Sequence, residues 1–199
     1  MQQINSLLFL LINATPNAPP ALVFFAYLLA QWAIYLVLLA LIIGWIRSPF
    51  PQREALFFAG TTAIAGLTIN LIIANIWYHP RPFMLGIGTQ LLAHGQDSSF
   101  PSDHTTVLFT TALALATGSR LRLWGGAGLL LAALVGWARV YLGVHWPFDI
   151  LGSILVAIGV TALMRLYALV AVGAICQRLN RIYIHALNTL SLPTRLFPR

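Results

Sequence analysis

The 199-residue sequence contains no lysine and a single cysteine, and only 8% of its residues are charged. The lone Cys176 excludes a disulfide framework or a cysteine-based metal site within the chain. Soluble domains carry about 25% charged residues, whereas 59% of this chain is apolar and its mean hydropathy is +0.85. A soluble fold of this length cannot bury so much apolar surface. The sequence therefore predicts an integral membrane protein.

The few charges are unevenly divided between the two signs. All eleven basic residues are arginines, the acidic residues number four, and the formal net charge is +7. The arginines form no basic run or basic face, so nucleic acid is not an expected partner. We interpret most of them as residues that orient membrane spans. Residues 1–20 lack the basic start of a cleavable signal peptide, so we expect them to remain in the mature protein.

Apolar runs predict an all-α bundle in one domain over 1–199. About 20 residues are needed to cross a bilayer, and the candidate transmembrane helices are five: 21–46, 55–77, 104–118, 123–141 and 148–174. The run "INSLLFLLINA" within residues 1–20 is too short to cross and is bounded by Pro16, so it predicts an interfacial helix. The tail, 177–199, alternates arginine with apolar residues and predicts a cytoplasmic amphipathic helix.

The arginines also predict which side each connection faces. Five spans place the chain ends on opposite sides, and most arginines then share the side that the positive-inside rule makes cytoplasmic. These are Arg47, Arg53, Arg120, Arg122, Arg178, Arg181, Arg195 and Arg199, with Arg165 inside the last span toward the same side. Only Arg81 and Arg139 lie at the outer ends of spans. Their positions contradict the charge bias and require another explanation.

The stretch "HPRPF" contains the first outer arginine. Pro80 and Pro82 flank Arg81 and favour a stiff, extended backbone. A guanidinium aimed in this way suits the oxygens of a phosphate group. The alternative is a proline pair that ends a helix, with an incidental arginine that reaches the interface.

The stretch "FPSDHTTVLF" reads as a helix start with Ser102 at the N-cap. A helix N-terminus offers free backbone N–H groups and a positive dipole end, which together can hold an anion. His104 in the first turn could reach the same anion. The alternative is a capping Ser102–Asp103 pair with a histidine at the interface.

The stretch "ARVYLGVHWPFDI", 138–150, combines Arg139, His145 and Asp149. Pro147 suits the first turn of a helix, so Asp149 should lie one turn from His145. A carboxylate that accepts from Nδ1–H leaves the Nε2 lone pair free, which makes the imidazole a nucleophile. A purely structural His–Asp pair is the alternative, but it does not explain Arg139.

The three stretches face the same side, and their conjunction favours function over the separate structural alternatives. Charged groups at membrane depth are costly, about 2.5–3.5 kcal/mol each on insertion scales. Burying two arginines, two histidines and an aspartate together would only destabilise the fold unless they bind something. The residue types predict a site that binds a phosphate ester.

Three motifs resemble the signature blocks of the type-2 phosphatidic acid phosphatase superfamily, membrane phosphatases that share a helical core with vanadium haloperoxidases. They are "PRP" at 80–82, "PSDH" at 101–104 and R-x5-H-x3-D across 139–149, and the resemblance covers about 55–165. "PSDH" and "GVHWPFD" further resemble the bacitracin-resistance-type undecaprenyl pyrophosphate phosphatases. Three positions depart from the usual pattern: Ala74 replaces a lysine, Asp103 a glycine and Ala138 a serine.

The resemblance implies a metal-independent hydrolase with no cofactor. It implies that His145 attacks phosphorus to form a phosphohistidine, that Asp149 stabilises the imidazolium, and that His104 acts as acid and then base. Its implied phosphate-binding residues are Arg81, Arg139, Ser102 and Asp103. A carboxylate at Asp103 should repel the substrate unless it turns away, is protonated or orients another group. Metal binding by the histidines and aspartates is disfavoured because guanidiniums would oppose a cation.

The implied reaction is hydrolysis of undecaprenyl pyrophosphate at the outer face of the bacterial inner membrane, which recycles the cell-wall lipid carrier. A broader lipid phosphatase and a lipid phosphotransferase are alternatives with the same site. A small transporter is disfavoured because the charges cluster at one face. Whether the segment 84–99, with "QLLAHGQ", forms a lid helix stays open, and His94 and Asp97 are expected to be surface groups.

Overall fold

The computed structural model of the protein describes residues 2–118, 120–191, 193 and 197–198. Those residues form helices and no strand, which confirms the predicted all-α fold. The elements are α1 (Gln2–Ile12), α2 (Pro20–Arg47), α3 (Phe50–Ile76), the 3₁₀ turn η1 (Pro82–Leu85), α4 (Asp103–Ala116), α5 (Arg122–Tyr141), α6 (Pro147–Leu163), the π turn η2 (Met164–Ala168) and α7 (Leu169–Thr189).

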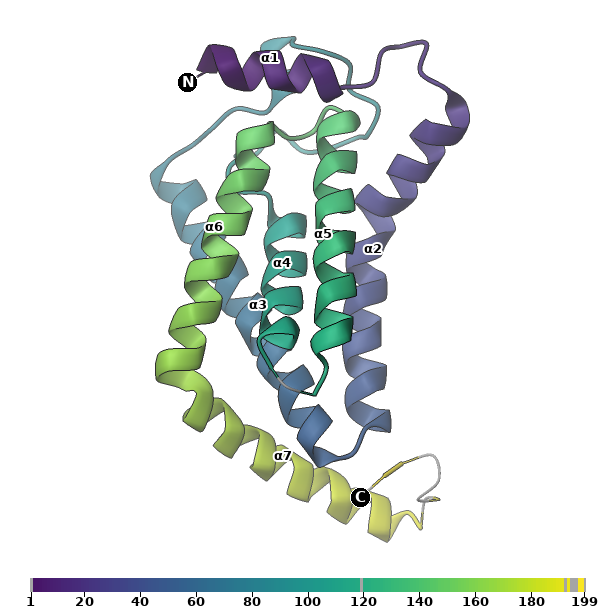
Figure 1. Ribbon diagram of the computed structural model, residues 1–199, viewed down its shortest axis with the longest axis vertical. Helices are drawn as coiled ribbons and strands as arrows, with labels where there is room; N and C mark the ends of the chain where they lie inside the picture. Colours follow the sequence, from purple (N-terminus) through teal and green to yellow (C-terminus); the bar gives the residue numbers. More distant parts are fainter. Residues whose placement is uncertain (1, 119, 192, 194–196, 199) are drawn as a thin grey trace.

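Helices α2 to α6 run back and forth along the long axis of a bundle (Figure 1). Helix α4 lies in the middle and packs against α2, α3, α5 and α6. Helix α1 lies across one end, and α7 extends across the other; we call these the α1 end and the α7 end. The connections 77–102 and 142–146 both lie at the α1 end, as the predicted topology requires.

Four helical stretches are long and apolar enough to cross a membrane. They are α2, α3, α5 and the run from Pro147 to Thr189, with mean hydropathies of 2.3, 1.9, 1.5 and 2.2. Helix α4 follows the predicted third span closely but has only 14 residues. It is six residues shorter than the 20-residue α5, so about 9 Å of helix is missing. Its start is therefore recessed from the α1 end (Figure 1).

The predicted boundary between the last span and the tail helix, at 174–177, differs from the structure, where a distinct helix begins earlier. Helix α6 ends at Leu163, and the chain continues through the π turn η2 into α7, which turns away across the α7 end. Within η2, Arg165 donates to Ala114 O and Thr117 Oγ1, both at 2.7 Å. These bonds tie the bend to the C-terminus of α4, where carbonyl groups lack helical partners.

Arg53 is not the solvated loop arginine that the sequence predicts. It lies within α3 and is fully buried. Its guanidinium donates to Asn180 Oδ1 of α7 at 2.6 Å and to Trp45 O at 3.0 Å, and it lies 4.5 Å from the ring centroid of Tyr183. The side chain therefore joins α7 to α2 and α3.

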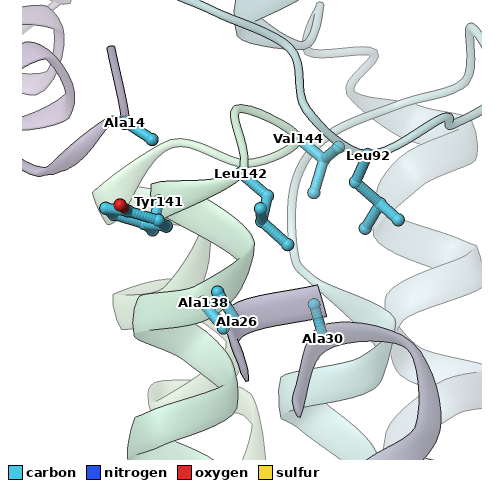
Figure 2. Packing of buried hydrophobic residues seen from close by; sticks show 8 residues of the cluster. All are labelled: Ala14, Ala26, Ala30, Leu92, Ala138, Tyr141, Leu142 and Val144. Carbon is cyan, nitrogen blue, oxygen red and sulfur yellow. The ribbon is translucent and has the colours of Figure 1, made fainter. Parts of the chain in front are cut away.

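A cluster of buried side chains fixes the connections at the α1 end (Figure 2). Ala26 and Ala30 of α2 face Ala138 of α5, and all three are fully buried, because small residues let helices approach closely. Leu92 and Val144, from the two connections, pack against the same cluster. The irregular segment after η1 is thereby anchored to the loop that precedes α6.

Candidate active site

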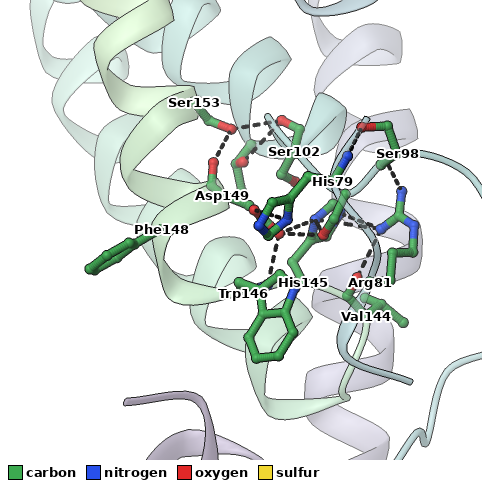
Figure 3. A network of polar contacts seen from close by, with 12 residues as sticks. His79, Arg81, Ser98, Ser102, Val144, His145, Trp146, Phe148, Asp149 and Ser153 are labelled. Atoms are coloured by element: carbon green, nitrogen blue, oxygen red, sulfur yellow. Dashed lines mark hydrogen bonds and ion pairs between the residues drawn. The ribbon is translucent and has the colours of Figure 1, made fainter. Parts of the chain in front are cut away.

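The loop before α6 places His145 and Asp149 in contact (Figure 3). Helix α6 begins at Pro147 as predicted. Asp149 Oδ2 accepts from the Trp146 backbone N–H at 2.8 Å and lies 3.3 Å from His145 Nδ1. Both side chains are almost fully buried. The predicted one-turn spacing of histidine and carboxylate is confirmed.

Arg81 lies against the same imidazole. Its Nη1 is 3.1 Å from His145 Nε2 and 3.5 Å from Nδ1, and it donates to Val144 O at 2.8 Å. We assign the proton of the neutral ring to Nδ1 because the Asp149 carboxylate faces that nitrogen. The backbone at Arg81 is extended, with φ −71° and ψ 157°, as the flanking prolines predict.

Arg139 lies in the last turn of α5, where its side chain is 1% exposed. Nη1 donates to Ala30 O at 3.1 Å, and Nε has no hydrogen-bond partner among the described residues. Burial lowers the pKa of His145 well below its ordinary value, and the charges of Arg139, Arg81, His94 and His104 lower it further, in that order. The nucleophile candidate is therefore a neutral imidazole close to both arginines.

The start of α4 contributes His104 and Ser102. Ser102 occupies the N-cap position as predicted, but its side chain makes no capping bond. Its buried Oγ finds no partner in the described part of the chain, while its carbonyl accepts from Ser153 Oγ at 2.9 Å. An unpaired hydroxyl beside free helix N–H groups is suited to phosphate oxygens. His104 is half-buried in the first helical turn.

Asp103 contacts α3. Its carboxylate is exposed and accepts from Asn70 Nδ2 at 2.9 Å. This bond is consistent with the option in which Asp103 orients another group, and its assignment to phosphate binding stays a prediction. Asp103 and Ala74, two of the departures from the family pattern, line one cavity of about 650 Å³ along α3.

Of the two expected surface groups, Asp97 is exposed as predicted, whereas His94 is half-buried beside the site. Residues 86–102 form no helix, and the segment brings the His94 ring to 6.1 Å from that of His145. Burial, followed by the charges of Arg81 and Arg139, lowers the pKa of His94 to about 4. Asp97 Oδ1 accepts from Arg81 Nε at 2.8 Å while its side chain stays 66% exposed.

Two further residues of the site were not identified from sequence. Ser99 Oγ donates a short hydrogen bond to Asp149 Oδ2 and lies 3.4 Å from His145 Nδ1. His79 Nδ1 lies 4.0 Å from Asp149 Oδ1. His79 directly precedes "PRP" and Ser99 directly precedes "FPSDH". These positions beside the motifs do not by themselves predict a contact with Asp149.

The arrangement provides a buried imidazole with a carboxylate at Nδ1 and the Arg81 guanidinium beside the ring. Arg139, and His104 in the first turn of α4, are near enough for their charges to lower the pKa of that imidazole. Such a set can attack a phosphorus atom and neutralise the charge that moves to its oxygens. Among the described residues, no three His, Cys, Asp or Glu side chains are grouped to hold a metal ion.

Comparisons with known proteins agree with this geometry. Residues 54–173 match the model of the PAP2 superfamily. The chain is 40% identical over 156 residues to "Putative undecaprenyl-diphosphatase YbjG" of Escherichia coli (strain K12), covering 78% of each chain. It is 38% identical over 130 residues to "Undecaprenyl-diphosphatase BcrC" of Bacillus subtilis (strain 168), covering 65% of this chain and 66% of that protein. The crystal structure of Aquifex aeolicus LpxE matches with a TM-score of 0.66 and 27% identity, over 82% of this chain and 96% of that one.

Proposed function

The chain belongs to the PAP2 superfamily, and we propose that it hydrolyses undecaprenyl diphosphate to undecaprenyl phosphate and inorganic phosphate. The observation that carries the proposal is the buried His145 imidazole, with Asp149 Oδ2 3.3 Å from Nδ1 and Arg81 Nη1 3.1 Å from Nε2. The names of the relatives with 38–40% identity support the diphosphate substrate.

In the first step, His145 Nε2 attacks the terminal phosphorus. An oxygen of that phosphoryl group accepts from Arg81 Nη1, which lies 3.1 Å from Nε2. The bond from phosphorus to the bridging oxygen breaks, and His104 protonates that oxygen as undecaprenyl phosphate leaves. Asp149 accepts from Nδ1–H throughout and stabilises the imidazolium of the phosphohistidine.

In the second step, His104, now neutral, takes a proton from water as the water attacks the phosphohistidine. The phosphorus–nitrogen bond breaks, and inorganic phosphate leaves. Arg81, Arg139, Ser102 Oγ and the first N–H groups of α4 are proposed to hold the three equatorial oxygens as charge shifts among them. The positive charge of the two guanidiniums takes the part that a metal ion plays in other phosphatases.

A diphosphate suits this site for two reasons. Its leaving group is a phosphate, which needs less acid assistance than an alkoxide. In addition, His94 lies beside His145 and both arginines, so an extra donor is available for a second phosphate group. A site for one phosphoryl group alone would not require it.

We propose that the α1 end faces the periplasm and that the C-terminus is cytoplasmic. Arg47, Arg120, Arg122, Arg178 and Arg181 all lie toward the α7 end, and an excess of arginine marks the cytoplasmic side of membrane proteins. With this orientation, the enzyme acts on the lipid carrier where cell-wall synthesis releases it, at the outer face of the bacterial inner membrane.

The test is phosphate release by the purified protein from a panel of lipids. Undecaprenyl diphosphate is expected to be hydrolysed faster than phosphatidate or phosphatidylglycerol phosphate, and a His145→Ala variant serves as the control. A preference for a monophosphate would replace the proposal with a broader lipid phosphatase. A substrate labelled with ³²P in its terminal phosphate separates the last alternative. If the label is recovered on a second lipid rather than as inorganic phosphate, the protein is a phosphotransferase.

A further inference from the structure

The two oxygens of the Asp149 carboxylate have very different surroundings. Oδ2 accepts from Ser99 Oγ and from the Trp146 backbone N–H, and it faces His145 Nδ1. Oδ1 is buried and has no hydrogen-bond partner among the described residues. A buried carboxylate oxygen without a donor is costly. The orphan oxygen therefore points to a contact that forms when the site is working.

The group that faces Oδ1 is His79. Its Nδ1 lies 4.0 Å away and is itself buried without a hydrogen-bond partner in the described chain. The ring lies edge-on to Trp77 and Trp146, with centroid distances of 5.7 and 6.4 Å. Two orphan polar atoms thus face each other across a gap that is about 1 Å too long for a hydrogen bond.

The His79 backbone is fixed by neighbours of the same site. Its N–H donates to Ser98 Oγ at 3.2 Å, and its carbonyl accepts from the Ser99 N–H at 2.7 Å. Ser98 O also accepts from Arg81 Nη2 at 3.1 Å. Arg81 and the extended segment that carries His79 are therefore linked through Ser98, so a phosphate that binds Arg81 can shift that segment.

We propose that His79 is a positioning residue that donates from Nδ1 to Asp149 Oδ1, so that one carboxylate is held between two imidazoles. This inference rests on the proposed function, in which Asp149 orients His145. Hydrogen bonds at catalytic sites are often long before the substrate binds and shorten in the complex. Burial lowers the pKa of His79, so the ring donates as a neutral imidazole.

The contact would act on the nucleophile through the carboxylate. With both oxygens paired, Asp149 cannot rotate, and Oδ2 stays aimed at His145 Nδ1 as that ring becomes positive. Without His79, the carboxylate is held at Oδ2 alone, by Ser99 Oγ and the Trp146 N–H. It can then pivot about that oxygen, which weakens the preference of the His145 proton for Nδ1 over Nε2, where the proton blocks attack. Because His79 does not touch the phosphate, its loss should lower kcat and leave KM nearly unchanged.

The experiment compares three substitutions that differ in where they place a donor. In His79→Asn, the amide nitrogen can occupy the position of Nδ1, whereas in His79→Gln it reaches toward the position of Nε2. His79→Ala removes the donor. The Ala and Gln variants are expected to lose about tenfold to a hundredfold in kcat, the Asn variant to recover most of it, and KM to change less than about twofold. His185→Ala, exposed on α7, is the matched control.

A second readout does not depend on turnover. ¹⁵N NMR of the histidine-labelled protein reports which ring nitrogen of His145 carries the proton, with the signal assigned from His145→Ala. We expect Nδ1–H in the wild type and the Asn variant, and a mixture in the Ala and Gln variants. If the Ala variant keeps the tautomer, or if Asn and Gln restore kcat equally, the inference is overturned. Failure of the wild type to hydrolyse the diphosphate would overturn the proposed function alone.

Discussion

Two arginines, both almost fully buried, lie at opposite ends of the bundle. Arg53 at the α7 end has its donors taken by the protein: it bonds to Trp45 O, Asn180 Oδ1 and Pro198 O at 3.0, 2.6 and 2.5 Å. Arg139 at the α1 end has one bond, to Ala30 O, and an Nε without a partner among the described residues.

The difference separates a structural arginine from one that awaits a ligand. Burying a charge is costly unless hydrogen bonds compensate for the lost water. For Arg53 that compensation is intramolecular, and the Tyr183 ring adds a cation–π contact. For Arg139 it is incomplete, which is expected if a substrate anion supplies the rest. Burial alone would not distinguish the two residues, whereas the count of satisfied donors does.

The largest effect is expected at His145, at the α1 end of the bundle, where Arg139 is incompletely hydrogen-bonded. His145→Ala should reduce phosphate release by about 10⁴-fold or more, since the loss of a nucleophile is of that order in other enzymes. The measurement is turnover of undecaprenyl diphosphate by the wild type and the variant, after their melting temperatures have been shown to match. Full turnover by the variant would show that another group attacks the phosphorus.

Arg139→Gln should reduce kcat/KM by about 10²–10³-fold, the usual cost of removing a donor that stabilises transition-state charge. Its melting temperature should change little, because only one hydrogen bond is lost. Enzyme kinetics and thermal unfolding in detergent test both parts. A variant that is unstable but active would place Arg139 in the same class as Arg53.

Arg53→Met should give the opposite result. It leaves Asn180 Oδ1 and backbone carbonyls without donors, so the free energy of unfolding should fall by about 1–3 kcal/mol. Specific activity below the unfolding transition should remain close to that of the wild type. Arg178→Met, at an exposed position on α7, controls for the loss of a positive charge. A loss of kcat without a loss of stability would contradict the comparison.

A smaller effect is expected on the pH profile. The charge of Arg139 lowers the pKa of His145, so Arg139→Gln should raise it. The variant should then lose kcat/KM at a higher pH than the wild type as the solution is acidified, because protonation removes the Nε2 lone pair. Titration of the substrate is common to both proteins, so the difference between their profiles isolates the enzyme. Superimposable profiles would count against a titrating His145.

The smallest effect is expected from metal removal. Excess chelator should leave hydrolysis unchanged, because Arg81 and Arg139 provide the positive charge at the phosphate. Phosphate release is measured with and without EDTA, and restoration by Mg²⁺ is tested in the same assay. A requirement for the ion would mean that the two guanidiniums do not suffice.

Local signals in the sequence were enough to locate the helices that frame the site. Pro147 begins α6 as predicted, since proline suits the first turn. The apolar spans then force the three motifs to one end of the bundle. The contact of His145 with Asp149 also follows. Asp149 lies in the first turn of α6 and His145 just before that turn, and residues four apart lie on the same side of a helix.

Contacts between distant irregular segments could not be predicted in this way. His94 and Asp97 lie in a stretch without periodicity, and long-range contacts such as the packing of Leu92 against α2 and α5 and the Arg81–Asp97 bond bring them to the site. Arg53 and Asn180 are 127 residues apart, and their bond depends on the π turn that redirects α7. An arginine next to a predicted loop reads as solvated until that docking is known.

The short central helix has a consequence for the path of the two products. Helix α4 is six residues shorter than α5, about 9 Å of helix, and its start lies inside the level that α5 reaches (Figure 1). Under the proposed function, a phosphate bound at this start would lie closer to the hydrocarbon, and the isoprenoid would not need to be lifted out of the bilayer. The lipid product would then leave sideways within the bilayer, whereas inorganic phosphate would leave upward to water. One passage therefore does not have to serve both.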